Sequence, residues 1–344
     1  MKKIIYAFIL VLIISLFTTC ATSGAVKGNP NKVVIYTSMY EYVIEAVKLE
    51  LRRQFPQYTI EFVYGGTGNL QSRVASEQAS GKLGCDILMV AEPAYSLELK
   101  ENGMLHPYKS REVANLAFDY DPDGYWYPVR ISNMVLAFNP EKNSRDTIPM
   151  SFDDFAHDSS VQGKISMRSP LTSGTSMAAV TALRDKYGYD YFDALAKQNI
   201  QIEYSSDNPI TKLETGEYSV IMILEESILR RRQEGSKLEV IYPTDGTVMI
   251  PSSIMIVNDK WSANKNIALA ETITDWFLSR DGQNAIVDGW MHSVRSDFNR
   301  LPYDAKPTNE IRAGSISVNW ENYFHQRNEI QARFQEYLAR RTGI

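Results

Sequence analysis

Short apolar runs alternate with longer segments of helical spacing in the stretch that begins at Lys32. The runs that predict strands are Lys32–Ser38, Tyr58–Tyr64 and Cys85–Ala91. The segments that predict helices are Glu41–Phe55, Gly65–Ala79 and Pro93–Asn102. Because each predicted strand is followed by a predicted helix, this stretch should fold as a parallel sheet with helices on both faces.

A second section of the same kind follows, and a long apolar strand precedes and follows it. The two long strands are Val129–Phe138 and Ser252–Val257. Between them the predicted strands are Lys164–Met167, Ile200–Tyr204, Val220–Leu224 and Leu238–Tyr242, and the predicted helices are Gly174–Tyr187, Pro209–Thr215 and Glu226–Gln233. Helical patterns dominate the rest of the chain.

Two such sections joined by long strands predict an α/β fold of two lobes with a cleft between them. We assign residues 32–130 and 247–344, including the C-terminal helices, to the first lobe and residues 131–246 to the second. Each lobe should contain a mostly parallel sheet flanked by helices, with the long crossing strands as the hinge. Sheets of this class bind their ligands beyond the carboxyl ends of the strands, which would face the cleft.

The N-terminus has the proportions of an export signal. It is basic, and the apolar run that follows, Ile4–Phe17, is shorter than the ~20 residues of a membrane span. Residues 1–20 would form a signal peptide whose end, Phe17–Cys20, resembles a bacterial lipobox with two departures from the usual pattern. Cys20 is therefore the candidate site of lipid attachment, the alternative being ordinary cleavage nearby. Residues 21–31 predict a flexible tether, so the mature protein should be an exported lipoprotein of the periplasm or cell surface.

Composition and charge argue against several classes of function. The formal net charge is −5 and the pI is about 5.6, whereas phosphate-backbone binders usually carry a strong basic excess, so we expect no nucleic-acid partner. Cys20 and Cys85 are the two cysteines, too few for a structural zinc framework. The chain has no Gly-x-Ser-x-Gly and no His-Glu-x-x-His motif. We therefore expect a protein that is not an enzyme and that uses neither a cofactor nor a metal centre.

The segment Thr172–Ser176 places four hydroxyl side chains and one glycine where a predicted strand gives way to a helix. Free backbone N–H groups in the first turn of a helix carry partial positive charge, a glycine lets an anion approach them, and Ser and Thr add donors. The segment therefore predicts an anion site with Ser173, Gly174, Thr175 and Ser176 as its contacts. The alternative is a plain N-cap, for which one Ser or Thr suffices.

The first lobe offers a similar junction at Gly65–Asn69, between a predicted strand and a predicted helix. Thr67 is its candidate ligand contact, although a tight strand–helix turn would explain the glycines as well. No Lys-Ser or Lys-Thr pair follows, so the segment is not a P-loop. Thr37 and Ser38, at the end of the first predicted strand, are further candidate hydrogen-bond donors.

Six segments, in a fixed order, carry a resemblance to a known family: Val33–Ser38, Gly65–Leu70, Cys85–Glu92, Pro128–Arg130, Ser169–Ser176 and Tyr242–Gly246. The chain resembles the family-1 extracellular solute-binding proteins of ABC importers, which have the type II periplasmic-binding-protein fold. It is most similar to the branch of ferric-ion-, sugar-phosphate- and 2-aminoethylphosphonate-binding proteins, over about Lys32 to Asp297. The resemblance implies two lobes that close on a ligand, with a permease and its ATPase as partners. We expect the protein to act as a monomer.

The pair Glu225-Glu226 bears on the choice of ligand. The resemblance implies that ferric-binding relatives have adjacent tyrosines here and often a first-lobe histidine, which the loop Tyr36–Tyr40 lacks. Carboxylates instead suit sugar hydroxyls or an amine, although either glutamate could simply stabilise a helix N-terminus. We therefore predict a small phosphorylated solute, with a hexose phosphate favoured over an aminophosphonate. By the resemblance, its phosphate would bind at Ser173–Ser176. The alternative is a ferric ion or ferric chelate, since carboxylate oxygens also bind Fe(III).

Two further residues have two interpretations each. Asp207 precedes Pro209 and suits a helix N-cap, whereas the resemblance implies a polar ligand contact in this loop. Arg130, at the start of a crossing strand, could pair with an anion or with a carboxylate of the other lobe. In the expected mechanism, hinge closure buries the ligand and forms the surface that the permease recognises.

Overall fold

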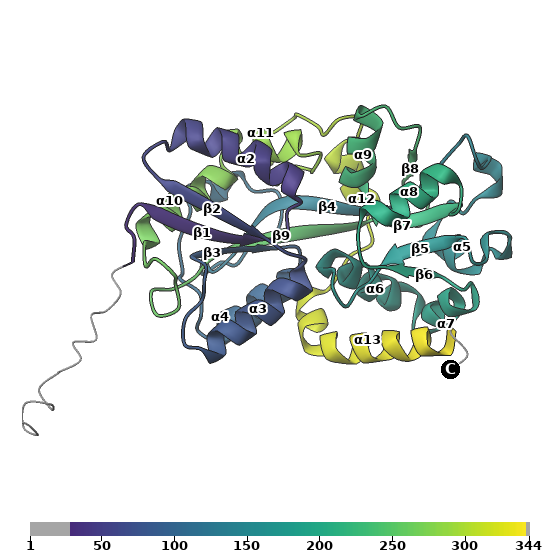
Figure 1. Ribbon diagram of the computed structural model, residues 1–344, viewed down its shortest axis with the longest axis horizontal. Coiled ribbons are helices and arrows are strands. Elements are labelled where there is room, and N and C mark those ends of the chain that lie inside the picture. The colour runs from purple at the N-terminus through teal and green to yellow at the C-terminus, as the bar shows by residue number, and fades with distance from the viewer. Residues whose placement is uncertain (1–27, 342–344) are drawn as a thin grey trace, which may run out of the picture.

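The computed structural model describes residues 28–341. Two lobes lie side by side along the long axis of the molecule, and helices cover both faces of the sheet that runs through them (Figure 1). The expected signal peptide, Cys20 and most of the expected tether lie outside the described residues. Within residues 28–341, no helix is long and apolar enough to cross a membrane.

The first lobe is built on three parallel strands. β1 (Lys32–Thr37) lies between β2 (Thr59–Tyr64) and β3 (Ile87–Val90) and pairs in parallel with both. Its helices are α2 (Glu41–Gln54), α3 (Thr67–Ala79) and α4 (Pro93–Glu101), with α10 (Ile267–Leu278) and α11 (Arg280–Asp288) returning from the C-terminal part of the chain. In Figure 1, α2, α10 and α11 lie above the sheet, and α3 and α4 lie below it.

The second lobe repeats this arrangement. β5 (Ile165–Arg168) pairs in parallel with β6 (Gln201–Glu203) and with β7 (Val220–Leu224), and the short strand β8 (Glu239–Ile241) belongs to the same lobe. Its helices are α5 (Phe152–His157), α6 (Gly174–Tyr187), α7 (Asp190–Lys197), α8 (Asp207–Thr215) and α9 (Glu225–Gln233). In two of these helices the side chain of the N-cap serine caps the first turn: Ser151 accepts from the backbone N–H of Asp154 at 2.9 Å, and Ser173 from that of Ser176 at 3.2 Å.

Two long strands pass from one lobe to the other. β4 (Tyr127–Phe138) and β9 (Val248–Ile256) pair antiparallel, and they join the two lobes into one sheet of order β2-β1-β3-β9-β4-β7-β5-β6, with β8 paired to β4. β9 pairs with β3 in the first lobe, and β4 pairs with β7 in the second. Every residue of β4 is buried. The crossing strands therefore form the hinge that the sequence predicts, and β9 extends four residues further back than expected, through Pro251 to Val248.

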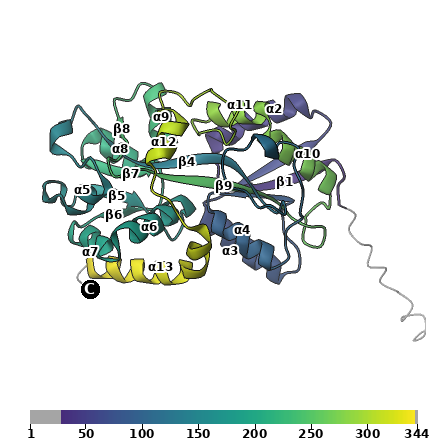
Figure 2. The same cartoon turned by 180° about the vertical axis from the view of Figure 1, so that it is seen from behind.

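The C-terminal segment contacts both lobes. After α12 (Thr308–Gly314), the helix α13 (Trp320–Arg341) runs along the second lobe beneath α6 and α7 (Figures 1 and 2). Buried side chains of α13, among them Tyr323 and Phe334, belong to the apolar core of the second lobe. Near its start, Arg327 forms an ion pair of 2.7 Å with Glu92 of the first lobe. From the sequence we assigned this helix to the first lobe, but its apolar face packs into the core of the second lobe.

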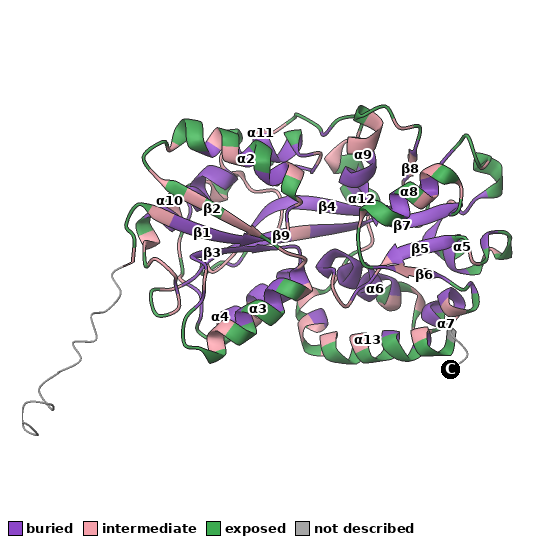
Figure 3. Ribbon diagram, in the orientation of Figure 1, coloured by how far each residue is buried: buried purple, intermediate pink, exposed green. Residues whose placement is uncertain are grey.

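Burial follows the period of each element. The strands are buried along most of their length, and the helices expose one face (Figure 3). One apolar cluster centres on β1, β3 and α10, and another centres on β5, β7, α6 and α13. Each lobe therefore has a core of its own, which is what allows two lobes to move about a hinge.

Candidate functional site

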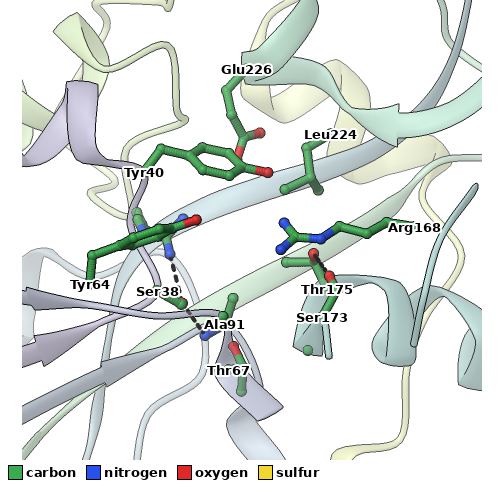
Figure 4. A pocket seen from close by; sticks show the side chains of 13 residues that line it. Ser38, Tyr40, Tyr64, Thr67, Ala91, Arg168, Ser173, Thr175, Leu224 and Glu226 are labelled. Atoms are coloured by element: carbon green, nitrogen blue, oxygen red, sulfur yellow. Dashed lines mark hydrogen bonds between the residues drawn. The ribbon is translucent and has the colours of Figure 1, made fainter. Parts of the chain in front are cut away.

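A cavity lies between the lobes where the parallel strands of both end (Figure 4). Its empty volume is about 340 Å³, part of which is open to solvent. Its lining residues come from both lobes and from the crossing strand β4: Ser38, Tyr40, Tyr64, Gly66, Thr67, Ala91, Arg130, Arg168, Ser173, Gly174, Thr175, Leu224 and Glu226. We call this cavity the cleft. An adjoining pocket shares Tyr40, Tyr64, Gly66 and Arg168 with the cleft, and we call it the mouth; its other charged residues are Glu41, Asp207 and Arg230.

The N-termini of two helices from opposite lobes meet at the cleft. α3 begins at Thr67 and α6 begins at Gly174, and both residues line the cavity. Their loops touch, because a Cβ added to Gly66 would lie 2.7 Å from the carbonyl oxygen of Thr172, and one added to Gly174 would lie 2.8 Å from the side chain of Thr67. The glycines therefore permit a closed arrangement, and the partial positive charges of two helix N-termini face one cavity.

The hydroxyl-rich segment supplies both a cap and open donors. Ser173 caps α6, and its Oγ also hydrogen bonds to Oγ1 of Thr175 at 3.0 Å. Oγ1 of Thr172 is buried and has no hydrogen-bond partner among the described residues. Ser176 lies in an adjoining pocket, together with Tyr40. The N-cap interpretation thus accounts for Ser173, but it does not require the hydroxyls of Thr172, Thr175 and Ser176.

Two arginines line the cleft without a carboxylate beside them. Arg130 is 3% exposed; its Nη1 donates to Ser132 Oγ at 3.0 Å and its Nη2 to Ser38 Oγ at 3.3 Å. Arg168, at the end of β5, donates through Nη1 to Ser206 Oγ at 2.9 Å. The Nε atoms of both are buried, and in the described part of the chain they have no hydrogen-bond acceptor. Burial lowers the pKa of Arg130 from its usual value, because desolvation disfavours the charged form.

Glu226 is the carboxylate that shares the cleft with these arginines. It is buried, and its Oε1 accepts from Ser132 Oγ at 2.9 Å, so Ser132 links it to Arg130. Burial raises the pKa of Glu226 to about 7, although the charge of Arg130 and the hydrogen bond from Ser132 act in the opposite direction. At neutral pH the cleft therefore holds two guanidiniums and one carboxylate that is partly protonated.

Glu225 points away from the cleft. Its carboxylate accepts from Asn133 Nδ2 at 3.1 Å, hydrogen bonds to His292 Nε2 at 2.9 Å and accepts from the hydroxyl of Tyr242. His292 also hydrogen bonds to Thr308 at 2.9 Å. Glu225 is thus part of a buried network near the hinge, and it does not line the cavity, although the sequence paired it with Glu226.

Two other predicted contacts lie outside the cavity. Thr37 is fully buried, and its Oγ1 accepts from the backbone N–H of Met39 at 3.1 Å. The side chain of Asp207 is 76% exposed at the mouth of the cleft, 3.7 Å from guanidinium nitrogens of Arg230 and of Arg231. The predicted residues that the fold brings together in the cavity are Ser38, Thr67, Arg130, Ser173, Gly174, Thr175 and Glu226.

Three polar side chains of the cleft were missed from the sequence: Tyr40, Tyr64 and Arg168. Tyr40 Oη lies 2.9 Å from Ser206 Oγ, a hydrogen bond between the lobes. Tyr64 ends β2 and Arg168 ends β5, so each follows the rule that ligand contacts lie at the carboxyl ends of parallel strands. That position is the signal that could have found them. In Figure 4 the side chains of all three point toward the same space.

The family described as "Bacterial extracellular solute-binding protein" matches residues 85–310 of the chain. The chain belongs to this family. The predicted family and its two-lobed α/β fold are thereby confirmed, and the protein is a solute-binding protein of the kind that serves ABC importers. Its family is extracellular, in agreement with the expected export.

Solved structures share the fold of this solute-binding protein. The periplasmic binding protein AfuA from Actinobacillus pleuropneumoniae, solved with fructose-6-phosphate bound, has a TM-score of 0.78 at 20% identity, over 90% of this chain and 98% of AfuA. Iron-bound HitA from Pseudomonas aeruginosa has a TM-score of 0.76 at 19% identity, over 89% of this chain and 99% of HitA. An uncharacterised protein of Haemophilus influenzae is 22% identical over 287 residues, which are 78% of this chain and 80% of that protein.

Proposed function

We propose that this solute-binding protein captures a small phosphorylated solute for an ABC importer, with a hexose phosphate favoured over an aminophosphonate. The observation that carries the proposal is the convergence of two helix N-termini, several hydroxyls and two guanidiniums on one cavity. All of these groups donate hydrogen bonds or attract negative charge, so together they suit a phosphoryl group.

We place the phosphoryl group between the N-termini of α3 and α6. There Thr67 and Thr175 offer hydroxyl donors, and the backbone N–H groups of both first turns point toward the anion. Arg130 and Arg168 supply the opposing charge from β4 and β5. A phosphate monoester suits this set because its three terminal oxygens can accept hydrogen bonds from several directions.

The rest of the ligand would lie toward Glu226 and the rings of Tyr40 and Tyr64. The Glu226 carboxyl group accepts hydrogen bonds from sugar hydroxyls, and in its ionised form it would pair with the amine of an aminophosphonate. The hydroxyl of Ser38 is a further donor in the same wall. The hexose phosphate is favoured because the two tyrosine rings offer a broad surface against which a sugar ring can pack.

Closure of the hinge would bury the solute. β4 and β9 connect the lobes, so a rotation about these strands would part the loops at Gly66 and Thr172, which touch in the closed arrangement. The closed form would then present a joint surface of both lobes to the permease and its ATPase. One chain supplies both halves of the cleft, so the proposed function needs only a monomer.

Membrane anchoring through Cys20 is part of the proposal, on the strength of the lipobox-like sequence Phe17–Cys20. The thioether-linked lipid would keep the protein beside the permease. Replacing Cys20 by Ala should release the exported protein from the membrane fraction, which fractionation and metabolic labelling with a fatty acid would detect. A Cys20→Ala protein that stays in the membrane fraction and carries label would contradict the anchor.

Fe(III) is the competing ligand, because HitA, a protein of the same fold, was solved with iron bound. Two features favour the anion. The guanidiniums of Arg130 and Arg168 would repel a trivalent cation. Tyr40 and Tyr64, the phenols of the cleft, both come from the first lobe, and burial raises the pKa of Tyr64, which opposes the phenolate that iron requires.

A thermal-shift screen tests the proposal directly. A ligand at a thousandfold excess over its Kd stabilises the folded state by ~4 kcal/mol, so a bound solute should raise Tm clearly. The probes are glucose 6-phosphate, 2-aminoethylphosphonate, inorganic phosphate and Fe(III)-citrate. We expect the largest shift with glucose 6-phosphate. A shift with Fe(III)-citrate alone would overturn the proposal.

A matched pair of N-cap variants separates ligand binding from helix capping. Replacing Ser173 and Thr175 together by Ala removes two hydroxyls from the cleft, whereas Ser151→Ala removes the cap of α5 elsewhere in the second lobe. Each loss of a cap should cost about 1 kcal/mol of stability. Only the cleft variant should weaken glucose 6-phosphate, by about tenfold or more, as measured by calorimetry. If the two variants bind glucose 6-phosphate with equal affinity, the segment Thr172–Ser176 serves only as a helix cap.

A further inference from the structure

Arg130 and Arg168 stand apart from the other buried arginines of the chain. Of the described arginines that are buried or half-buried, they are the two that have no carboxylate oxygen within 4.0 Å. Arg295 shows the usual arrangement, with Glu112 and Asp297 both at 2.7 Å. Within the described part of the chain, the buried and half-buried guanidiniums outside the cleft are therefore all paired with a carboxylate.

Charge in the cleft is not balanced by the protein. Glu226 is the carboxylate that lines the cavity, and it reaches Arg130 only through Ser132. One carboxylate faces two guanidiniums, and the N-termini of α3 and α6 add further positive potential. A buried cation without a counter-charge is unfavourable, so a bound anion would stabilise this arrangement.

We infer that Arg130 and Arg168 make the cleft selective for a head group with two negative charges. Arg168 is the residue that discriminates between a head group with two charges and one with a single charge. The inference rests on the proposed function and narrows it from phosphorylated solutes in general to dianionic head groups. A phosphate monoester carries between 1.5 and 2 negative charges at pH 7. A sulfate ester or sulfonate has similar shape and oxygen acceptors but one charge, so it should be rejected.

Arg168 is assigned this role because of its neighbours. It extends from the end of β5 into the cavity, where Ser206 holds Nη1 and leaves Nε without an acceptor among the described residues. Tyr64 and Thr175 line the same cavity and are uncharged at neutral pH. Arg168 therefore contributes a whole charge that no carboxylate within 4.0 Å offsets, although Glu41 and Asp207 line the adjoining pocket.

The experiment compares two matched pairs of ligands by calorimetry at pH 7.5. Glucose 6-phosphate is set against glucose 6-sulfate, and 2-aminoethylphosphonate against 2-aminoethanesulfonate. In each pair phosphorus is exchanged for sulfur and one negative charge is lost, with little change of shape. The wild-type protein should bind at least one phosphorus compound about tenfold or more tightly than its sulfur partner.

Variants of Arg168 test whether this residue causes the preference for phosphorus over sulfur compounds. Arg168→Gln should weaken the preferred phosphorus ligand by roughly 30-fold or more and bring the phosphorus-to-sulfur ratio close to one. Arg168→Lys retains the charge and should restore much of the ratio. Arg231→Gln is the control, because Arg231 is also half-buried but lies beside Asp207 and Glu234; the ratio should not change. Circular dichroism of each variant verifies folding.

The outcomes are distinguishable. Equal binding of phosphorus and sulfur compounds, or a preference that survives in Arg168→Gln, would overturn the inference while leaving capture of a phosphorylated solute intact. If neither phosphorus compound binds, the proposed function fails and the inference fails with it. A preference that disappears in Arg168→Gln and returns in Arg168→Lys supports both.

Discussion

Glu225 and Glu226 are adjacent in the chain, but their carboxylates enter two buried clusters that differ in how completely they are paired. Glu225 has Asn133, His292 and Tyr242 as partners. Glu226 has Ser132, and it shares the cleft with two guanidiniums that have no carboxylate beside them.

The difference distinguishes a structural cluster from a ligand site. A buried carboxylate that is surrounded by hydrogen-bond donors stabilises one arrangement of the chain. A buried site that lacks a counter-charge costs stability and is retained where a ligand completes it. The hinge network around Glu225 belongs to the first kind, and the cleft belongs to the second.

The largest effect should come from breaking the paired cluster. Glu225→Ala would leave His292, Asn133 and Tyr242 without their shared acceptor, so the free energy of unfolding should fall by about 3–5 kcal/mol. Urea unfolding measures it. Glu226→Gln is the control, because the amide oxygen can still accept from Ser132, and it should cost less than about 1 kcal/mol. Equal losses in the two variants would remove the distinction between the clusters.

The ion pair of Glu92 with Arg327 extends the comparison to the junction between α13 and the first lobe. Glu92 is buried and also accepts hydrogen bonds from Tyr323 at 2.9 Å and from Gln71 at 3.0 Å. Because these two donors remain in Arg327→Met, the free energy of unfolding should fall by about 2 kcal/mol, less than when an isolated buried ion pair is broken. Thermal unfolding and urea unfolding measure the loss.

The cost of Arg327→Met should depend on pH with a defined sign. Burial raises the pKa of Glu92, and removing Arg327 should raise it further. Between the unfolded pKa of about 4.3 and the raised folded pKa, the folded state binds more protons, so its stability falls as pH rises. The loss should be greater at pH 8 than at pH 5. A loss that is independent of pH would mean that Glu92 stays ionised in the variant.

A smaller effect concerns Glu226 itself. Burial raises the pKa of Glu226 to about 7, and the charge of Glu225 raises it further. Arg130 and the hydrogen bond from Ser132 lower it. The ring of Tyr42 also lies near the Glu226 carboxylate. A dianion would raise that pKa further, so binding should take up a proton. Affinity for glucose 6-phosphate should therefore fall by about fivefold from pH 6.5 to pH 8. Calorimetry in buffers of different ionisation enthalpy measures the proton uptake, and Glu226→Gln should abolish it. Proton release by the wild type would contradict this assignment.

The smallest expected effect is a gain in the stability of the ligand-free protein. Arg168→Met removes a charge that the protein does not balance, so the ligand-free variant should equal the wild type in stability or exceed it by up to about 1 kcal/mol. Protein refolded without ligand is compared by thermal unfolding. A loss of several kcal/mol would show that Arg168 stabilises the closed arrangement by itself and would weaken the contrast with Glu225.

Local pattern was enough to predict most elements near the cleft. The alternation of β1, α2, β2, α3, β3 and α4 follows from the period of apolar residues, and the N-cap at Ser173 follows from the residue type. The two crossing strands were also predicted, because long apolar runs of this kind are unusual in short α/β units. The hydroxyl-rich segment was found for the same reason, since its chemistry lies within a few consecutive residues.

The sequence by itself therefore determined the fold class, the family and one wall of the cleft, because these depend on local periodicity and on short motifs. Only the tertiary structure decided which of Glu225 and Glu226 faces the cavity, since consecutive residues at a helix start point in different directions and the docking of α9 selects between them. It also brought Arg130 and Arg168 together from β4 and β5. Their lack of a carboxylate partner is a property of three-dimensional neighbours, and no local pattern records it.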